Sequence, residues 1–83
     1  MKDAIRETIK QFILKEFLPG EDPSNLTDEL PLISGGILDS IATLKLILFA
    51  EERYGISFEA HEVDKEHLDT IDRIVNLVAS KME

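Results

Sequence analysis

The feature of the sequence that most constrains its fold is the position of its helix breakers. Every proline, and every glycine except Gly55, lies between residues 19 and 36. Proline and glycine interrupt helices, so the segments on either side of this stretch are free to be helical. No segment alternates apolar and polar residues as a half-buried strand does. The 83 residues contain no cysteine that could form a disulfide. We therefore expect a single domain over residues 1–83, an all-α four-helix bundle with a long loop between its first two helices.

Four helices are predicted from apolar spacing, capping residues and the breakers. The first is ended by Pro19–Gly20, and Asp39 is the predicted N-cap of the second, which ends at Gly55. Asp69 or Thr70 is the predicted cap of the last helix. The predicted helices cover residues 2–17, 40–54, about 62–66 for a short third helix, and 71 onward. The side chains expected to be buried in the first and last helices are Ile5, Ile9, Phe12, Ile13, Phe17, Ile71, Ile74, Val75, Val78 and Met82.

The loop over residues 20–36 is long for so small a domain. Such loops are usually functional or are pinned by their own apolar side chains. We expect this one to be pinned across the bundle, with Leu26, Leu30, Leu32 and Ile33 as its anchors.

The second helix is apolar nearly all round, which is more than one core face requires. Its core face is predicted to hold Thr43, Leu46, Ile47, Ala50 and Tyr54, and a second face holds Ile41, Leu44, Lys45, Leu48 and Glu52. This second face must be covered by the loop or by a partner, and we expect both, with Leu44 and Leu48 lining an internal pocket. The alternative is a structural face that the domain itself covers completely.

Ser40 follows a flexible glycine pair and stands at the start of the second helix, where Asp39 as cap leaves its hydroxyl free. The nucleophile elbow of serine hydrolases has glycine two residues before and after the serine, and this chain has other residues there. The candidate bases His61 and His67 lie on different sides of any helix, so we predict no catalytic residue and no metal site. An anion attached to Ser40 would be favoured by the helix N-terminus, whereas the alternative is an ordinary capping serine.

The formal net charge of −8 argues against nucleic acid and against anionic membrane surfaces as partners. It leaves basic protein partners, or a role in solubility alone. No signal peptide and no membrane-spanning segment is predicted, so we expect a cytoplasmic protein.

The segment from Gly36 to Ile41 resembles the Asp-Ser-Leu motif of acyl and peptidyl carrier proteins, with Ile41 in the leucine position. The similarity extends over nearly the whole chain, including residues 44–47, 51–56 and 68–71. It implies a four-helix bundle with a minor third helix. It also implies that a phosphopantetheinyl transferase moves 4'-phosphopantetheine from coenzyme A onto Ser40, beside Asp39. The thiol of that arm would carry an acyl or aminoacyl group as a thioester.

The resemblance also implies partners: a ligase or transferase that loads the acyl or aminoacyl group, and a downstream synthase or transferase. Family partners dock on the second helix, which fits its surplus apolar face, and a monomer is expected because docking needs a free surface. The predicted contacts are Ile41, Leu44, Lys45, Leu48 and Phe49.

Ala42 and Lys45 depart from fatty-acid carriers, which usually have acidic residues early in this helix. This difference favours a dedicated polyketide, nonribosomal-peptide or aminoacyl pathway over primary fatty-acid synthesis. The rival interpretation is an unmodified helical adaptor that binds a protein through the same helix.

Overall fold

The helices of the protein begin and end close to where the breakers and caps place them. The structure, a computed structural model, describes residues 2–82, and within that range it contains helices and no strand. The α-helices are α1 (Lys2–Phe17), α2 (Ser40–Tyr54), α3 (Lys65–Leu68) and α4 (Ile71–Met82), with 3₁₀ turns η1 (Pro23–Asn25) and η2 (Ala60–Glu62). The all-α four-helix prediction is therefore confirmed.

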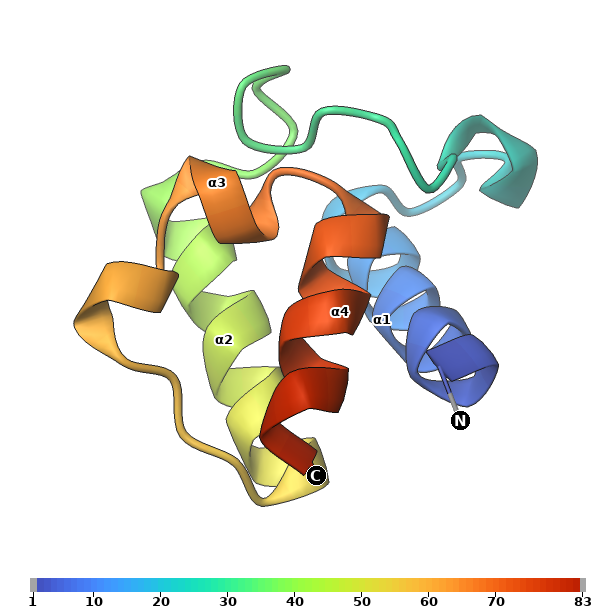
Figure 1. Cartoon of the computed structure of the whole chain (residues 1–83). Coiled ribbons are helices and arrows are strands. Elements are labelled where there is room, and N and C mark those ends of the chain that lie inside the picture. Colours follow the sequence, from blue (N-terminus) through green and yellow to red (C-terminus); the bar gives the residue numbers. More distant parts are fainter. Residues whose placement is uncertain (1, 83) are drawn as a thin grey trace.

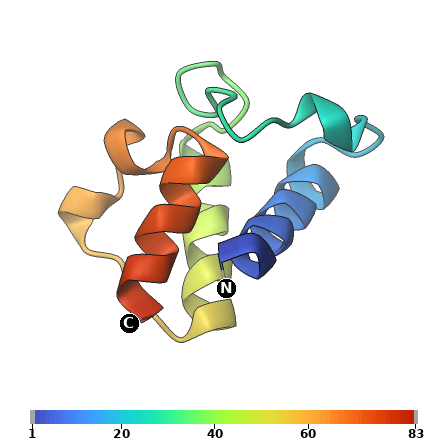
Figure 2. The ribbon, with the colours of Figure 1, turned by 45° about the vertical axis from the view of Figure 1, so that its right-hand side comes forward.

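Three long helices surround the core, and α4 packs against both α1 and α2. In Figure 1, α2 and α4 run in the same direction and α1 runs in the opposite one, and Figure 2 shows the same arrangement from another side. The loop between α1 and α2 crosses the end of the bundle where α2 and α4 begin, and α3 lies at that end as well (Figure 1). The start of α2, the loop and α3 are thus neighbours.

The core is entirely apolar among the residues that the structure describes. The α1 prediction is confirmed for Ile5, Ile9 and Ile13, while Phe12 and Phe17 are partly buried. In α4 the buried side chains are Ile71, Ile74, Val75, Leu77 and Val78. Met82 was predicted to be buried but is 41% exposed. The buried face ends one turn before it, at Val78, and Leu77, which was not predicted to be buried, is 8% exposed.

The long loop is held by its own leucines. Leu26 and Leu32 are 1% and 0% exposed, so their role as anchors is confirmed. Leu30 and Ile33 pack partly buried against the core. Leu38, at the end of the loop, is also buried and is a further anchor.

The short third helix begins later than its predicted position near residues 62–66. Asp64 caps α3, because its carboxylate accepts a hydrogen bond of 3.0 Å from the His67 amide. Residues 60–62 form the separate turn η2 instead. The predicted position of the short third helix was therefore wrong: the helix begins after its cap, Asp64, and ends at Leu68.

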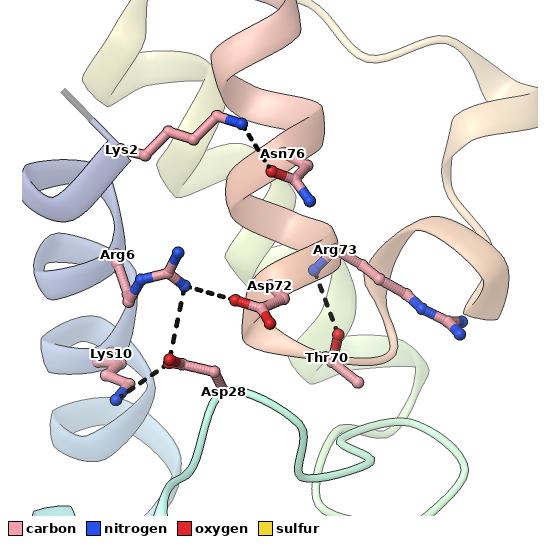
Figure 3. Close-up of polar contacts among 8 residues, drawn as sticks. All are labelled: Lys2, Arg6, Lys10, Asp28, Thr70, Asp72, Arg73 and Asn76. Carbon is pink, nitrogen blue, oxygen red and sulfur yellow. Dashed lines mark hydrogen bonds and ion pairs between the residues drawn. The ribbon is translucent and has the colours of Figure 1, made fainter.

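Charged side chains join α1, the loop and α4 at one edge of the bundle (Figure 3). The Arg6 guanidinium donates to an Asp72 carboxylate oxygen at 2.6 Å and lies 3.7 Å from Asp28. Lys10 lies 3.2 Å from the other Asp28 oxygen, which is shielded from solvent. The backbone oxygen of Asp28 also accepts from the Asp72 amide at 3.2 Å. Asp28 thus connects the loop to both helices.

We expect Leu32→Ala to lower the free energy of unfolding by about 2–4 kcal/mol, because it removes a fully buried side chain and leaves a cavity. Leu44→Ala is the matched control, since Leu44 is 55% exposed and its loss should change stability by less than about 0.5 kcal/mol. Urea unfolding followed by circular dichroism measures both. Equal losses for the two variants would contradict the assignment of Leu32 as an anchor.

Candidate functional site

Ser40 is the first residue of α2, and its side chain is exposed. The preceding Asp39 caps the helix: its carboxylate accepts from the Ala42 amide at 2.7 Å, and its carbonyl accepts from the Thr43 amide at 2.9 Å. The predicted cap is therefore confirmed. Within residues 2–82 the Ser40 hydroxyl makes no hydrogen bond, because Asp39 and not Ser40 satisfies the first turn. A free hydroxyl at the positive end of a helix is suited to carry an anionic group.

The glycine pair before Ser40 lies in a turn. A side chain on Gly35 would place its Cβ too close to the Pro31 carbonyl oxygen, and Gly36 has a φ of +80°, which favours glycine. The amides of Ile37 and Leu38 both donate to the Leu32 carbonyl, at 2.9 and 2.8 Å. These two hydrogen bonds connect the turn to the residues directly before Asp39 and Ser40.

Asp69 ties this turn to the junction between α3 and α4. Its carboxylate accepts from the amides of Ile33 and Ser34 at 2.8 and 2.9 Å, and from the Ser34 hydroxyl at 2.8 Å. Its carbonyl accepts from the Leu32 amide at 2.6 Å. We call this set of bonds the Asp69 clasp. The hydrogen bonds from Ser34, first the amide and then the hydroxyl, lower the pKa of Asp69 below its ordinary value.

Asp69 was predicted as one of two possible caps of the last helix, and it lies in the 68–71 segment that resembles carrier proteins. In the structure Thr70 caps α4, since its hydroxyl oxygen accepts from the Arg73 amide at 3.2 Å (Figure 3). The Asp69 carboxylate is turned the other way, toward a partner 35 residues earlier in the chain. No local pattern identifies such a partner, so the clasp was not predictable from spacing.

A groove of about 660 Å³ opens beside Ser40. One wall is formed by the loop, the floor by α2, and the other wall by the segment that enters α3. Its lining residues are Ile33, Leu38, Asp39, Ser40, Thr43, Leu44, Ile47, Val63, Asp64 and Lys65. The internal pocket expected from Leu44 and Leu48 is not what the structure shows, because this groove is open and Leu48 does not line it.

The second face of α2 is not covered by the loop. Ile41, Leu44 and Leu48 are 67%, 55% and 54% exposed, and we call these three side chains the apolar α2 face. Lys45 is exposed beside them. The alternative of a fully covered structural face is therefore wrong, and so is the expectation that the loop covers it. A face of this kind is typical of a protein-binding surface.

Phe49, the fifth predicted contact, is turned partly inward. Its ring stacks on that of Phe12 in α1, with centroids 4.1 Å apart and an interplanar angle of 14°. Phe12 in turn meets Phe17 edge to face at 5.7 Å. Phe49 therefore has a structural role between α1 and α2 that its position in the helix did not reveal. Thr43 and Tyr54, both predicted for the core face, are half-buried.

Of the two histidines, His61 is exposed and His67 is half-buried. His61 belongs to η2, and His67 belongs to α3, where its Nδ1 lies 2.8 Å from Asp64. Neither lines the groove beside Ser40. Over residues 2–82 no group of three or more histidine, cysteine, aspartate or glutamate side chains is arranged to hold a metal ion. In the same range, no helix has the length and apolar character needed to cross a bilayer.

The lowered pKa of Asp69 makes the stabilising effect of the clasp depend on pH. A carboxyl group with a folded-state pKa below its unfolded value of 3.8 stabilises the fold above that value and loses the effect as pH falls through the folded-state pKa. We expect Asp69→Ala to be less stable than the wild type at pH 7, and the difference to narrow as pH falls from about 5 to about 2. Chemical denaturation of both proteins over this pH series measures it. A difference independent of pH would contradict the clasp.

Comparison with known proteins places the chain among carriers. No family model matches the sequence. A D-alanyl carrier protein of Streptococcus suis (strain 98HAH33) is 35% identical over 78 residues, which is 94% of this chain and 95% of the relative. One from Lactobacillus acidophilus is 35% identical over 63 residues, 76% of this chain and 78% of the relative.

A third relative, the D-alanyl carrier protein of Streptococcus pyogenes serotype M5, is 32% identical over 72 residues, 87% of each chain. Carrier proteins are not themselves enzymes, which confirms the expectation of a non-catalytic protein. The alignment with the first of these relatives covers 94% of the chain, so it includes the Ser40 segment and nearly all of the fold. The chain belongs to the D-alanyl carrier protein family.

Proposed function

We propose that this carrier protein is armed at Ser40 with 4'-phosphopantetheine and that its cargo is D-alanine. The observation that carries the proposal is the state of the Ser40 hydroxyl. It is exposed at the first position of α2, and Asp39 relieves it of any capping role. A transferase can therefore reach the oxygen without breaking an interaction of the fold.

The surroundings of Ser40 fit such an arm. Backbone amides at the start of α2 favour a phosphodiester there, while the neighbouring Asp39 carboxylate would repel it or share a divalent cation with it. The groove beside Ser40 offers apolar side chains, including Leu44 and Val63, along which a flexible chain can lie. When bound, the arm supplies a thiol, which this cysteine-free chain lacks.

The relatives favour one of the three pathway types that the sequence left open. They are named for D-alanine, an amino acid, and this supports the aminoacyl type over the polyketide and nonribosomal-peptide types. Ala42 and Lys45 depart from the acidic pattern of fatty-acid carriers, which argues against primary fatty-acid synthesis and does not distinguish among the three types. We therefore propose a D-alanyl thioester as the loaded form.

We propose that three kinds of enzyme dock on this carrier: a phosphopantetheinyl transferase, a ligase that loads D-alanine, and a downstream transferase. The apolar α2 face and Lys45 are the proposed contacts, with the outward edge of Phe49. This face begins one residue after Ser40, so an enzyme bound there has its active site close to the arm. The proposal includes a monomer, since docking needs this face free, and a cytoplasmic location.

Co-expression with a broad-specificity transferase tests the attachment site. We expect the intact mass to increase by one phosphopantetheine, and Ser40→Ala to abolish the increase because it removes the attacking oxygen. Ser57→Ala, which alters another exposed serine, is the control and should be modified like the wild type. An unmodified wild-type chain would favour the rival interpretation, a helical adaptor, whereas modification of Ser40→Ala would move the site elsewhere.

Loading of the armed protein tests the cargo. With a D-alanine-activating ligase and ATP, we expect a D-alanyl thioester that hydroxylamine cleaves. Leu48→Glu places a charge on the apolar α2 face and should raise the KM for the carrier roughly tenfold, with unchanged thermal stability. Ala4→Glu, exposed on α1, is the control. Efficient malonyl loading without D-alanyl loading would contradict the proposed cargo.

A further inference from the structure

The segment that leads to Ser40 is connected to the α3–α4 junction through backbone hydrogen bonds. The Leu32 amide donates to the Asp69 carbonyl, and the Leu32 carbonyl accepts from the amides of Ile37 and Leu38. Leu38 is followed directly by the cap Asp39 and then by Ser40. Two hydrogen-bonded steps therefore lead from Asp69 to the residue that precedes the cap of α2.

Asp69 also joins the two walls of the groove beside Ser40. Ile33, whose amide donates to the Asp69 carboxylate at 2.8 Å, belongs to the loop wall. Lys65, on the opposite wall, accepts through its carbonyl from the Asp69 amide at 3.0 Å. One residue thus holds both sides of the groove, because it ends α3 and at the same time binds the loop.

We propose that Asp69 is a positioning residue for Ser40: the Asp69 clasp holds the preceding turn against α3, and this sets how efficiently a transferase modifies the serine. The inference rests on the proposed attachment at Ser40. It assigns a role to a residue outside α2 that touches neither the serine nor, in this proposal, the arm.

The Asp69 clasp is suited to this role because its carboxylate bonds order the turn and are not part of the apolar core. Leu32 and Leu38 are 0% and 2% exposed, so their apolar contacts hold the loop to the bundle independently of the Asp69 carboxylate. The carboxylate bonds of Asp69 are instead made at the surface, to the exposed Ser34 and the half-buried Ile33. Loss of the carboxylate should therefore loosen the turn locally and leave the helices folded.

A loosened turn lowers the fraction of molecules that present Ser40 in the conformation the transferase binds. The apparent dissociation constant rises in inverse proportion to that fraction, while the rate of the bound complex changes little. For Asp69→Ala we expect the KM of the unmodified chain in phosphopantetheine transfer to rise roughly tenfold, with kcat within about twofold of the wild type. Asp69→Asn keeps an oxygen that accepts from both loop amides and should restore most of the loss.

Asp22→Ala is the matched control. Asp22 accepts from the amide and the hydroxyl of Ser24 at 2.9 Å, so it makes a similar aspartate–serine pair in the same loop, away from Ser40. It should leave the KM unchanged. Hydrogen exchange of residues 31–38, measured on the unmodified proteins, should speed up in Asp69→Ala and not in Asp22→Ala. Ser34→Ala removes only the hydrogen bond from the Ser34 hydroxyl to Asp69 and should raise the KM about twofold to threefold. This variant replaces Asp69→Ala in the test if Asp69→Ala does not fold.

The outcomes separate this inference from the proposed function. A wild-type chain that gains no phosphopantetheine overturns both. A wild-type chain that is modified, with Asp69→Ala and Ser34→Ala matching Asp22→Ala in KM, overturns only the role of Asp69. A raised KM that Asp69→Asn restores, together with faster exchange in residues 31–38, supports it.

Discussion

The structure depends most on the burial of Leu32 at the point where the loop meets the core. Its side chain is 0% exposed, its amide donates to the Asp69 carbonyl, and its carbonyl receives two amides from the turn before Ser40. Apolar burial holds Leu32 in the core, and its hydrogen bonds hold the turn that precedes α2 against it. The orientation of Ser40 is in this sense a consequence of one buried leucine far from any helix centre.

The features that could be predicted from the sequence are those with local causes. The ends of α1 and α2 follow from Pro19, Gly55 and the Asp39 cap, each of which acts on residues a few positions away. The exposure of Ser40 follows from the same cap. The groove, the clasp and the stack of Phe12 on Phe49 depend on residues that meet across long stretches of chain. No periodicity encodes those pairings, so they became visible only in three dimensions.

The surplus apolar character of α2 is explained by a division between its two faces. Ala42, Leu46, Ile47 and Ala50 fill the core, and the apolar α2 face is left outside. Keeping three large apolar side chains in water is unfavourable for a small domain unless another protein covers them. Ion pairs join α1, the loop and α4 at an edge of the bundle, through Arg6, Lys10, Asp28 and Asp72. The charged contacts that join these elements therefore involve none of the residues of the apolar α2 face.

The central claim is that a single serine carries the functional group, and the protein isolated from its own cells tests it most directly. Trypsin should release residues 16–45 as one peptide, which contains Ser24 and Ser34 as well as Ser40. Fragmentation mass spectrometry of this peptide should place one phosphopantetheine on Ser40. A bare peptide in actively growing cells, or the group on either of the other two serines, would contradict the account.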